Sequence, residues 1–409
     1  MPRTDPTTII VGAGPAGVSL AYLLASRGVS VTLLEQHNDF ARAFRGEILL
    51  PSGFEALQQM GLAELIKRIP HSAPTAFELY ANGARMFVLR MNSKFFDYRP
   101  LTALSQPDFL EAVVNVTKTF PCFRLELGAT VTGLVRTNGR VSGVTLRTQT
   151  GTRTLQASLI IGTDGRHSVV RKSCQLNSQK HGLDVDVIWF KMPAPDFFLN
   201  PTSFRGYVGR AHLLLAYPAP DGLLQVACLI QKNSYAEFRR RHGSAWIEEI
   251  ARNVSPDLAT HFRSHQHSIG RLTLLSAISD RVTDWSVRGA LVIGDAAHTM
   301  SPVGGQGINI ALRDAIVAAN HLVPVFRSTP SDHRIDVTAR AIGLERTAEL
   351  AHIQRLQAFP PRVLMGRSWL SAAVRATMPR LLRFSAVRTM AAPLVRTLLL
   401  GQGDVQLRV

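Results

Sequence analysis

The sequence is poor in cysteine, in acidic residues and in long apolar runs. Its three cysteines, Cys122, Cys174 and Cys228, stand far apart and form no Cys-x-x-Cys pair. We therefore expect neither a disulfide framework nor a zinc site, and we expect a reducing compartment, the cytoplasm. No run of about 18 uncharged apolar residues is present, so we expect no membrane-spanning helix. The first residues do not resemble a secretory signal.

Acidic residues are outnumbered, because 29 Asp and Glu stand against 46 Lys and Arg, which gives a formal net charge of +17. The basic residues are spread along the chain and form no nucleic-acid motif, so we expect no nucleic-acid partner. The exception is residues 359–400, where arginines interrupt short apolar runs. This stretch predicts helices that cap a neighbouring domain, the interpretation we favour, or that touch an anionic membrane peripherally.

Hydrophobic residues make up 46% of the 409 residues, which is enough for a substantial core. The length predicts two or three interlocked domains. The chain opens with a buried strand at residues 7–11, a helix at 18–27 and a second strand at 29–34, which together begin a βαβ unit.

A glycine-rich turn joins the first strand to the first helix, with Gly12, Gly14 and Gly17 in the spacing of a dinucleotide site. The first glycine permits a tight turn, the second lets a pyrophosphate approach the helix N-terminus, and the third allows close packing. Glu35, at the end of the second strand, is placed to accept hydrogen bonds from a ribose. An ordinary glycine-rich turn would leave Glu35 unexplained, so we predict dinucleotide binding.

The middle of the chain changes character. Residues 185–192, 207–217 and 223–230 predict strands of an antiparallel sheet inserted into the first domain. The α/β pattern returns with a buried strand at residues 290–293 and a helix at 308–323.

Two further motifs decide which dinucleotide is bound. Residues 163–171 read Thr-Asp-Gly-Arg-His-Ser-Val-Val-Arg, and residues 294–309 read Gly-Asp-Ala-Ala-His-Thr-Met-Ser-Pro-Val-Gly-Gly-Gln-Gly-Ile-Asn. With the N-terminal glycines, they resemble the three motifs of the group A flavin-dependent aromatic hydroxylases, which have the p-hydroxybenzoate hydroxylase fold. The resemblance spans about residues 7–325.

This resemblance implies an α/β fold with three parts. The FAD-binding domain, Rossmann-like and of the glutathione-reductase type, would comprise residues 1–72, 100–177 and 280–355. An inserted antiparallel-sheet domain for the substrate would comprise residues 73–99 and 178–279. A C-terminal helical cap would comprise residues 356–409.

The resemblance also implies the residues around the FAD. Asp295 would accept hydrogen bonds from the ribityl hydroxyls, and backbone N–H groups at the helix start after it would face the flavin ring. Arg45 would touch the pyrophosphate, Gly46 would lie behind the ring, and Gln106 stands where many relatives have arginine. The full set of predicted cofactor-binding residues is Gly12, Gly14, Pro15, Ala16, Gly17, Glu35, Arg45, Gly46, Gln106, Asp164, Gly165, Asp295, Pro302, Gly305, Gly307, Ile308 and Asn309.

The activity that the resemblance implies is monooxygenation. NADH or NADPH reduces FAD, O₂ adds at flavin C4a, and the hydroperoxide delivers one oxygen atom to an aromatic or polycyclic small molecule. No metal is needed, because the cofactor carries the chemistry. The sequence does not choose between NADH and NADPH or fix the oligomeric state.

The substrate side is less legible, and no catalytic residue is assigned there. Arg205, Tyr207, His212 and Tyr217 lie in expected strands, with Trp189 and Phe190 nearby, but core packing explains each of them as well. Residues 212–217 lack an arginine that would grip a carboxylate, which favours an uncharged substrate. His298 is interpreted as structural rather than as a base.

Three alternatives remain. A flavin-dependent halogenase shares the fold, although residues 189–193, Trp-Phe-Lys-Met-Pro, do not match the halogenase segment. A flavin oxidase or desaturase would not insert oxygen. A basic binding protein that holds FAD without turnover would not consume NAD(P)H.

Overall fold

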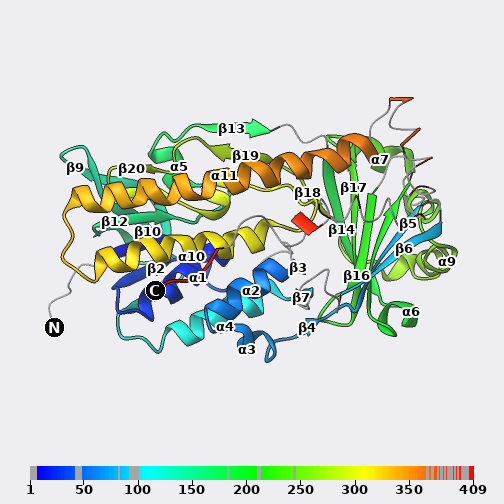
Figure 1. Ribbon diagram of the computed structural model, residues 1–409, viewed down its shortest axis with the longest axis horizontal. Helices are drawn as coiled ribbons and strands as arrows, with labels where there is room; N and C mark the ends of the chain where they lie inside the picture. The colour runs from blue at the N-terminus through cyan, green and yellow to red at the C-terminus, as the bar shows by residue number, and fades with distance from the viewer. Residues whose placement is uncertain are drawn as a thin grey trace.

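The computed structural model describes residues 7–41, 48–81, 83–91, 101–181, 185–209, 213–242, 246–364 and 405–409, with scattered positions between 368 and 397. The elongated molecule has an α/β part at one end and a large antiparallel sheet at the other, joined along one side by the long helix α11 (Figure 1).

The α/β part is built on a six-stranded sheet in the order β20-β21-β12-β1-β2-β8. Strand β1 (Thr8–Val11) pairs in parallel with β2 (Val31–Leu34) and with β12 (Leu159–Gly162), and β12 pairs in parallel with β21 (Ala290–Val292). The central strands are fully buried, as expected for a parallel sheet covered on both faces. The expected βαβ unit and its return late in the chain are confirmed. The outer strands are β8 (Phe123–Glu126) and β20 (Ser286–Val287).

Helices pack against this sheet (Figure 1). Helix α1 (Pro15–Ala25) contacts α4 (Gln106–Thr117) and α10 (Gly307–Phe326). Helix α11 (Asp332–Leu364) then lies along α10. The sequence did not predict α11, which runs through the expected start of a separate cap at residue 356.

The second part is a seven-stranded sheet in the order β18-β14-β17-β16-β15-β5-β6. Its strands come from two regions of the chain. They are β5 (Ala76–Ala81), β6 (Ala84–Arg90), β14 (Val185–Pro193), β15 (Ser203–Val208), β16 (Leu213–Pro218), β17 (Leu223–Gln231) and β18 (Thr273–Leu275).

The prediction of a single strand over residues 207–217 is wrong. The chain instead makes two antiparallel strands, β15 and β16, in which Tyr207 pairs with Leu214. Strand β15 ends before Gly209, where a Cβ atom would lie 2.3 Å from the Asn253 side chain. A close approach of this kind needs glycine. Because apolar residues flank Gly209 on both sides, the sequence pattern continued across it and did not indicate that the strand ends there.

The remaining elements complete the two parts. The short strands and 3₁₀ helices are β3 (Ile48–Leu49), β4 (His71–Ser72), β7 (Thr102–Leu104), β9 (Thr130–Thr137), β10 (Arg140–Thr148), β11 (Gly151–Gln156), β13 (Ser178–His181), β19 (Ser279–Val282), β22 (His298–Thr299), η3 (Gln266–Ser268) and η4 (Gly294–Ala296). The other helices are α2 (Pro51–Gln59), α3 (Ala63–Ile66), α5 (Val169–Ser173), α6 (Asp196–Leu199), α7 (Tyr235–His242), α8 (Trp246–Ala251) and α9 (Pro256–Ser264).

The last five residues return to the α/β part. Gln59 accepts a hydrogen bond from the Leu407 N–H and donates to the Val405 carbonyl, and Asn320 binds the alternate residues Gln406 and Arg408. Val405, Leu407 and Val409 pack against the core. Among the described residues, no helix is long and apolar enough to cross a membrane.

Candidate functional site

The glycine turn after β1 has the geometry that a phosphate group requires. Gly12 has φ +101°, and a Cβ atom on Gly17 would lie 2.1 Å from the Gly12 carbonyl oxygen. On Gly14, by contrast, a Cβ atom would meet only the Thr163 carbonyl oxygen, at 4.0 Å. The space beside Gly14 at the start of α1 is therefore open, as close approach of a pyrophosphate needs.

Glu35 is buried and turned back toward this loop. Its Oε2 accepts a hydrogen bond from the Ala13 N–H at 2.9 Å, and its Oε1 lies 2.6 Å from His37 Nδ1. The carboxylate therefore holds the glycine turn as well as standing at the end of β2, where a ribose is expected.

The second motif lies against the first. The Thr163 hydroxyl donates to the Val11 and Gly12 carbonyls, at 2.9 and 2.6 Å. Asp164 accepts hydrogen bonds from the Ser168 hydroxyl and the Val169 N–H, so its carboxylate caps α5. Burial raises the pKa of Asp164, although these hydrogen bonds act in the opposite direction. Asp164 and Gly165 are thus close to the turn, with the Asp164 side chain directed at its own helix.

The third motif completes the site from the other side of α1. A Cβ atom on Gly294 would lie 2.9 Å from the Ala16 side chain, so the two motifs touch. Asp295 follows in η4 and is half-buried. Asp295 thus follows directly after the glycine that touches α1. Helix α1 itself begins after Gly14 without a side-chain cap.

The start of α10 is the second helix N-terminus at this site. Gly304 and Gly305 have φ +80° and +62°, and the helix begins at Gly307 with no side-chain cap. A Cβ atom on Gly307 would meet nothing within 4 Å. The first N–H groups of a helix have no partner within the helix, so α10 offers donors and a positive dipole end to an electron-rich ring.

Asn309 has a role that its position in the motif did not reveal. Its side chain is fully buried, accepts a hydrogen bond from the Leu50 N–H at 2.8 Å and donates to the Ile48 and Gly305 carbonyls. It therefore fixes the chain that follows residues 42–47. Arg45 and Gly46 are among those residues and lie outside the described part of the chain.

A small sheet places Gln106 near the segment that Asn309 binds. Ile48 of β3 pairs with Ala103 of β7, and α4 begins at Gln106 just after β7. Gln106 is 8% exposed. The pairing thus brings Gln106 and the segment after Gly46 to one side of the cofactor motifs.

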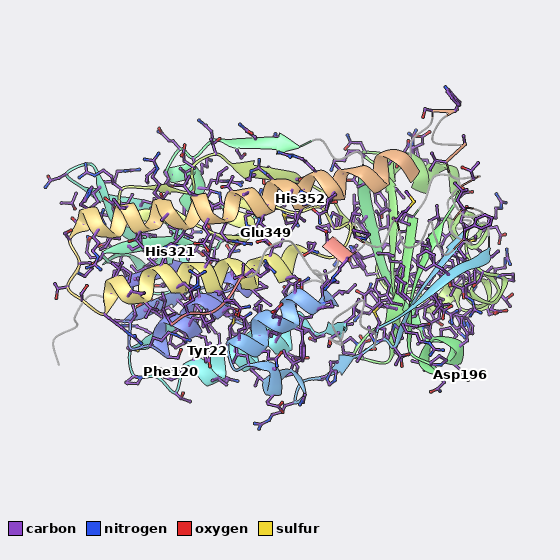
Figure 2. The ribbon with its side chains drawn as sticks, viewed as in Figure 1. Tyr22, Phe120, Asp196, His321, Glu349 and His352 are labelled. Atoms are coloured by element: carbon purple, nitrogen blue, oxygen red, sulfur yellow. The ribbon has the colours of Figure 1, made fainter. Side chains whose placement is uncertain are left out.

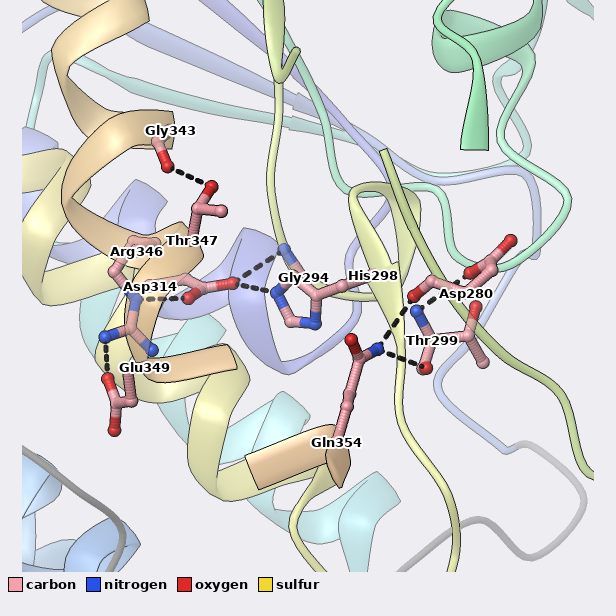
Figure 3. A network of polar contacts seen from close by, with 10 residues as sticks. All are labelled: Asp280, Gly294, His298, Thr299, Asp314, Gly343, Arg346, Thr347, Glu349 and Gln354. Atoms are coloured by element: carbon pink, nitrogen blue, oxygen red, sulfur yellow. Dashed lines mark hydrogen bonds and ion pairs between the residues drawn. The ribbon is translucent and has the colours of Figure 1, made fainter. Parts of the chain in front are cut away.

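A buried network of charged groups lies beneath the third motif (Figure 3). One Asp314 oxygen accepts hydrogen bonds from the Gly294 N–H at 3.0 Å and from His298 Nε2 at 2.6 Å. The other accepts from Arg346 Nε at 2.7 Å, and Arg346 also pairs with Glu349. Glu349 belongs to α11, on the side of that helix toward α10, where it also pairs with Arg313 at 2.8 Å (Figure 2). Asp314 therefore fixes both ends of the loop that carries Asp295.

The charge state of this network follows from its partners. Burial alone would raise the pKa of Asp314, but His298 and Arg346 outweigh it and the pKa lies below its usual range. His298 is 1% exposed, and its Nε2 donates to the carboxylate. It is enclosed in the core and bound to Asp314, which is consistent with the structural interpretation.

The seven-stranded sheet turns two different faces to its surroundings. Trp189, Phe204 and Tyr217 belong to a cluster on the face toward the α/β part, together with Val303 of the third motif. Phe190 and Tyr207 belong to the opposite face, which α8 and α9 cover. We call the first face the aromatic wall. Its described members are Phe77, Leu89, Val187, Trp189, Phe204, Leu213, Leu215, Tyr217, Ala227, Leu229 and Leu275.

Charged groups of the sheet are directed away from this wall or are paired. Arg205 lies on the helix-covered side, where its NH2 group donates to the Phe197 carbonyl and its guanidinium lies 4.3 Å from the Phe198 ring centroid. Lys191 pairs with Asp221 at 2.6 Å. His212 lies outside the described residues. On the side of the helices, Asp196 stands at the far end of the molecule (Figure 2).

The open space beside Gly14 and Gly307, next to two uncapped helix N-termini, fits a dinucleotide that carries a pyrophosphate and a flavin ring. Residues 5–348 of the chain match the family described as FAD binding domain. The chain belongs to this family.

The relatives specify the reaction class. The chain is 31% identical over 406 residues to the 6-methylpretetramide 4-monooxygenase of Streptomyces rimosus, a match that covers 98% of this chain and 93% of that protein. Among solved structures, the p-nitrophenol 4-monooxygenase PnpA of Pseudomonas putida DLL-E4 superposes with a TM-score of 0.80 at 20% identity, covering 98% of this chain and all of that one. The flavin-dependent brominase Bmp2 superposes with a TM-score of 0.75 at 16% identity, covering 96% and 94%, which shows a shared fold.

The protein is an FAD-dependent monooxygenase, and the predicted fold, reaction class and cofactor are confirmed. When bound, FAD accepts electrons from NADH or NADPH and supplies the activation of O₂. The three motifs lie together at the starts of α1 and α10 and would hold the cofactor there, and Val303 of the third motif packs in the cluster of the aromatic wall. Burial raises the pKa of the Cys174 thiol to about 11 and that of the Cys228 thiol to about 12, so these two thiols stay protonated at neutral pH.

Proposed function

We propose that this monooxygenase hydroxylates an uncharged polycyclic aromatic compound. The aromatic wall carries the proposal. It combines Trp189 with the stacked pair Phe204 and Tyr217, whose ring centroids lie 5.1 Å apart. These three side chains are 0–9% exposed, and we propose that the cluster forms the back of an apolar substrate site. Such a site favours a large flat substrate, since each aromatic ring buried against it adds contact area and stacking.

The absence of a free cation on the described part of the wall supports an uncharged substrate. A buried carboxylate needs a paired charge, and the nearest cations on the strands, Arg205 and Lys191, are engaged elsewhere. The name of the relative in Streptomyces rimosus gives 6-methylpretetramide as its substrate, which is a further reason to test polyketide-like ring systems first.

We further propose that FAD is held by the predicted residue set. The glycine turn and the start of α10 would bind through backbone N–H groups, and Asp295 would bind the ribityl hydroxyls. The division into an FAD domain, an inserted sheet domain and a C-terminal cap is retained as part of this proposal. The cytoplasm is the proposed compartment, and the three free cysteines accord with it.

The test is a screen of NADH and NADPH oxidation with matched pairs of compounds. Each pair contains an uncharged polycyclic phenol and the same ring system with one added carboxylate. We expect faster flavin reduction and NAD(P)H consumption with the uncharged member. Preference for the carboxylated member, or for single-ring phenols, would contradict the proposed substrate class and leave the monooxygenase assignment intact.

A further inference from the structure

Two glutamines of α11 bind the backbone of the third motif. Gln354 is 5% exposed and Gln357 is fully buried. They lie three residues apart, on one face of the helix. Gln354 Nε2 donates to the Asp280 carbonyl at 2.9 Å and to the Thr299 carbonyl at 3.4 Å. Gln357 Nε2 donates to the Ser301 and Val303 carbonyls, at 3.2 and 2.7 Å.

The bound carbonyls follow one another along a short segment. Thr299 ends β22, and Val303 lies in the turn before α10, so the amides hold the chain from the end of the strand into the turn. Strand β22 pairs with β19 only through His298 and Thr299. Beyond this pairing, the glutamine amides satisfy backbone carbonyls that burial would otherwise leave without a donor.

This segment connects the two halves of the active site. It begins just after the Asp295 loop and ends at the glycines before α10. The Val303 side chain belongs to the cluster of the aromatic wall. A displacement of the segment would therefore move the start of α10 and the wall relative to each other.

The packing of α11 against α10 does not depend on the amides of Gln354 and Gln357. Arg346 and Glu349 already join the two helices through Asp314 and Arg313. Both Nε2 bonds of Gln357 go to the loop backbone, whereas Gln354 joins the Thr299 carbonyl to β19, through the Asp280 carbonyl and Arg281 Nη1. None of these bonds goes to α10, so they serve the position of the loop and its attachment to β19.

We propose that Gln354 and Gln357 are positioning residues for the FAD, which fix the segment Thr299–Val303 and with it the start of α10. The inference rests on the FAD site and not on the substrate class. Removing the amide donors would let the segment move, so that the open N–H groups of α10 no longer match the flavin ring.

The test measures FAD binding to the full-length apoprotein by flavin fluorescence and absorbance. Gln357→Met keeps the length of the side chain and removes two donated bonds. We expect the FAD dissociation constant to rise about tenfold, as the loss of one to two net hydrogen bonds implies. We also expect the visible spectrum of the bound flavin to change, because its ring environment changes.

The matched control is Gln225→Met. Gln225 is equally buried and donates one bond to the Phe190 carbonyl at 3.0 Å, away from the motif. We expect this variant to lower the melting temperature of the apoprotein while the FAD dissociation constant and flavin spectrum stay as in the wild type. Unchanged FAD affinity and spectrum in Gln357→Met, with a melting temperature lowered as in the control, would overturn the proposal.

A second measurement needs no variant. Since coupling between a ligand and a segment is reciprocal, FAD should slow amide hydrogen exchange in the α11 turn around Gln354 and Gln357 of the wild-type protein. Exchange there that is the same with and without FAD would overturn the proposal even if Gln357→Met fails to fold. The α11 turn around Val337 serves as the internal reference. Val337 is 55% exposed, so we expect amide exchange in that turn to be the same with and without FAD.

Discussion

Asp314 and Gly294 are joined by a hydrogen bond of 3.0 Å from the glycine N–H to a carboxylate oxygen that also binds His298. Through this bond a residue of helix α10 determines where the loop with Asp295 lies. The cofactor motif is thus supported by a charged group that the motif does not contain, and the support continues into α11 through Arg346.

Asp314→Asn should lower the free energy of unfolding by about 3 kcal/mol, because breaking a buried ion pair leaves an uncompensated charge. One amide oxygen of the asparagine can still accept, but its NH₂ group would face Arg346 or His298, which are donors. Urea unfolding of the apoprotein measures the change. Glu345→Gln is the control, since the exposed pair of Glu345 with His321 also joins α10 to α11, at 2.7 Å. We expect a change of about 0–1 kcal/mol there. Equal effects in the two variants would contradict the role of the buried pair.

The same pair predicts a pH dependence. The folded-state pKa of Asp314 lies below its value of about 3.9 in the unfolded chain, so the ionised form stabilises the fold. Its contribution is present above that unfolded value and is lost as the pH falls toward the folded-state pKa. The stability difference between wild type and Asp314→Asn should be constant between about pH 7 and 5 and should shrink below about pH 4. A difference that grows on acidification would mean that the protonated acid is the stabilising form.

Gly14→Val tests the phosphate site. Because Gly14 has φ −78° and open space beside it, we expect the apoprotein to keep its stability within about 1 kcal/mol. The side chain would occupy the approach of the pyrophosphate, so FAD affinity should fall by about a hundredfold or more. Fluorescence titration and thermal unfolding give the two values.

The control for that variant is Gly17→Ala. Its Cβ atom would lie 2.1 Å from the Gly12 carbonyl oxygen, so the apoprotein itself should be destabilised by about 1–3 kcal/mol. If Gly14→Val binds FAD normally, the turn does not bind the phosphates.

Trp189→Leu and Phe190→Leu compare neighbouring residues on opposite faces of β14. The first removes part of the aromatic wall, so the KM for an accepted polycyclic compound should rise about tenfold, as the loss of one stacked ring implies. The second alters the helix-covered core and should cost about 1–1.5 kcal/mol of stability with little change in KM. Steady-state kinetics and urea unfolding separate the two effects. A KM that rises equally in both variants would contradict the assignment of the wall.

The parts of the fold that sequence predicted are those with local signals. The turn between β1 and α1 could be predicted because the glycines, the buried strand and Glu35 lie within one βαβ unit. The third motif and the strand before it could likewise be predicted from the sequence. By contrast, α11 was missed because Gly343, Pro360 and Pro361 interrupt its pattern. Only the structure explains why a glycine stands at position 343 inside this helix, because a Cβ atom there would lie 2.8 Å from the Trp285 side chain.

The supporting residues of the site could not be predicted, since their partners are remote in the chain. Nothing near Asp314 in the sequence indicates that it binds Gly294, His298 and Arg346 from three different elements. Which face of the sheet each side chain of β14 and β15 occupies could be assigned only from the structure. There Trp189 and Phe190 lie on opposite faces, and Arg205 points away from the wall. The direction of the Asp164 side chain likewise depends on the start of α5.

The most direct test of the account is the fate of molecular oxygen. The purified protein with FAD, NADH or NADPH, and a compound accepted in the screen is supplied with ¹⁸O₂, and the product is analysed by mass spectrometry. The account predicts a product that carries one ¹⁸O atom, formed with consumption of one NAD(P)H, and the same product when bromide is added. A product without ¹⁸O, as an oxidase or desaturase would give, or a brominated product in the presence of bromide, would contradict it.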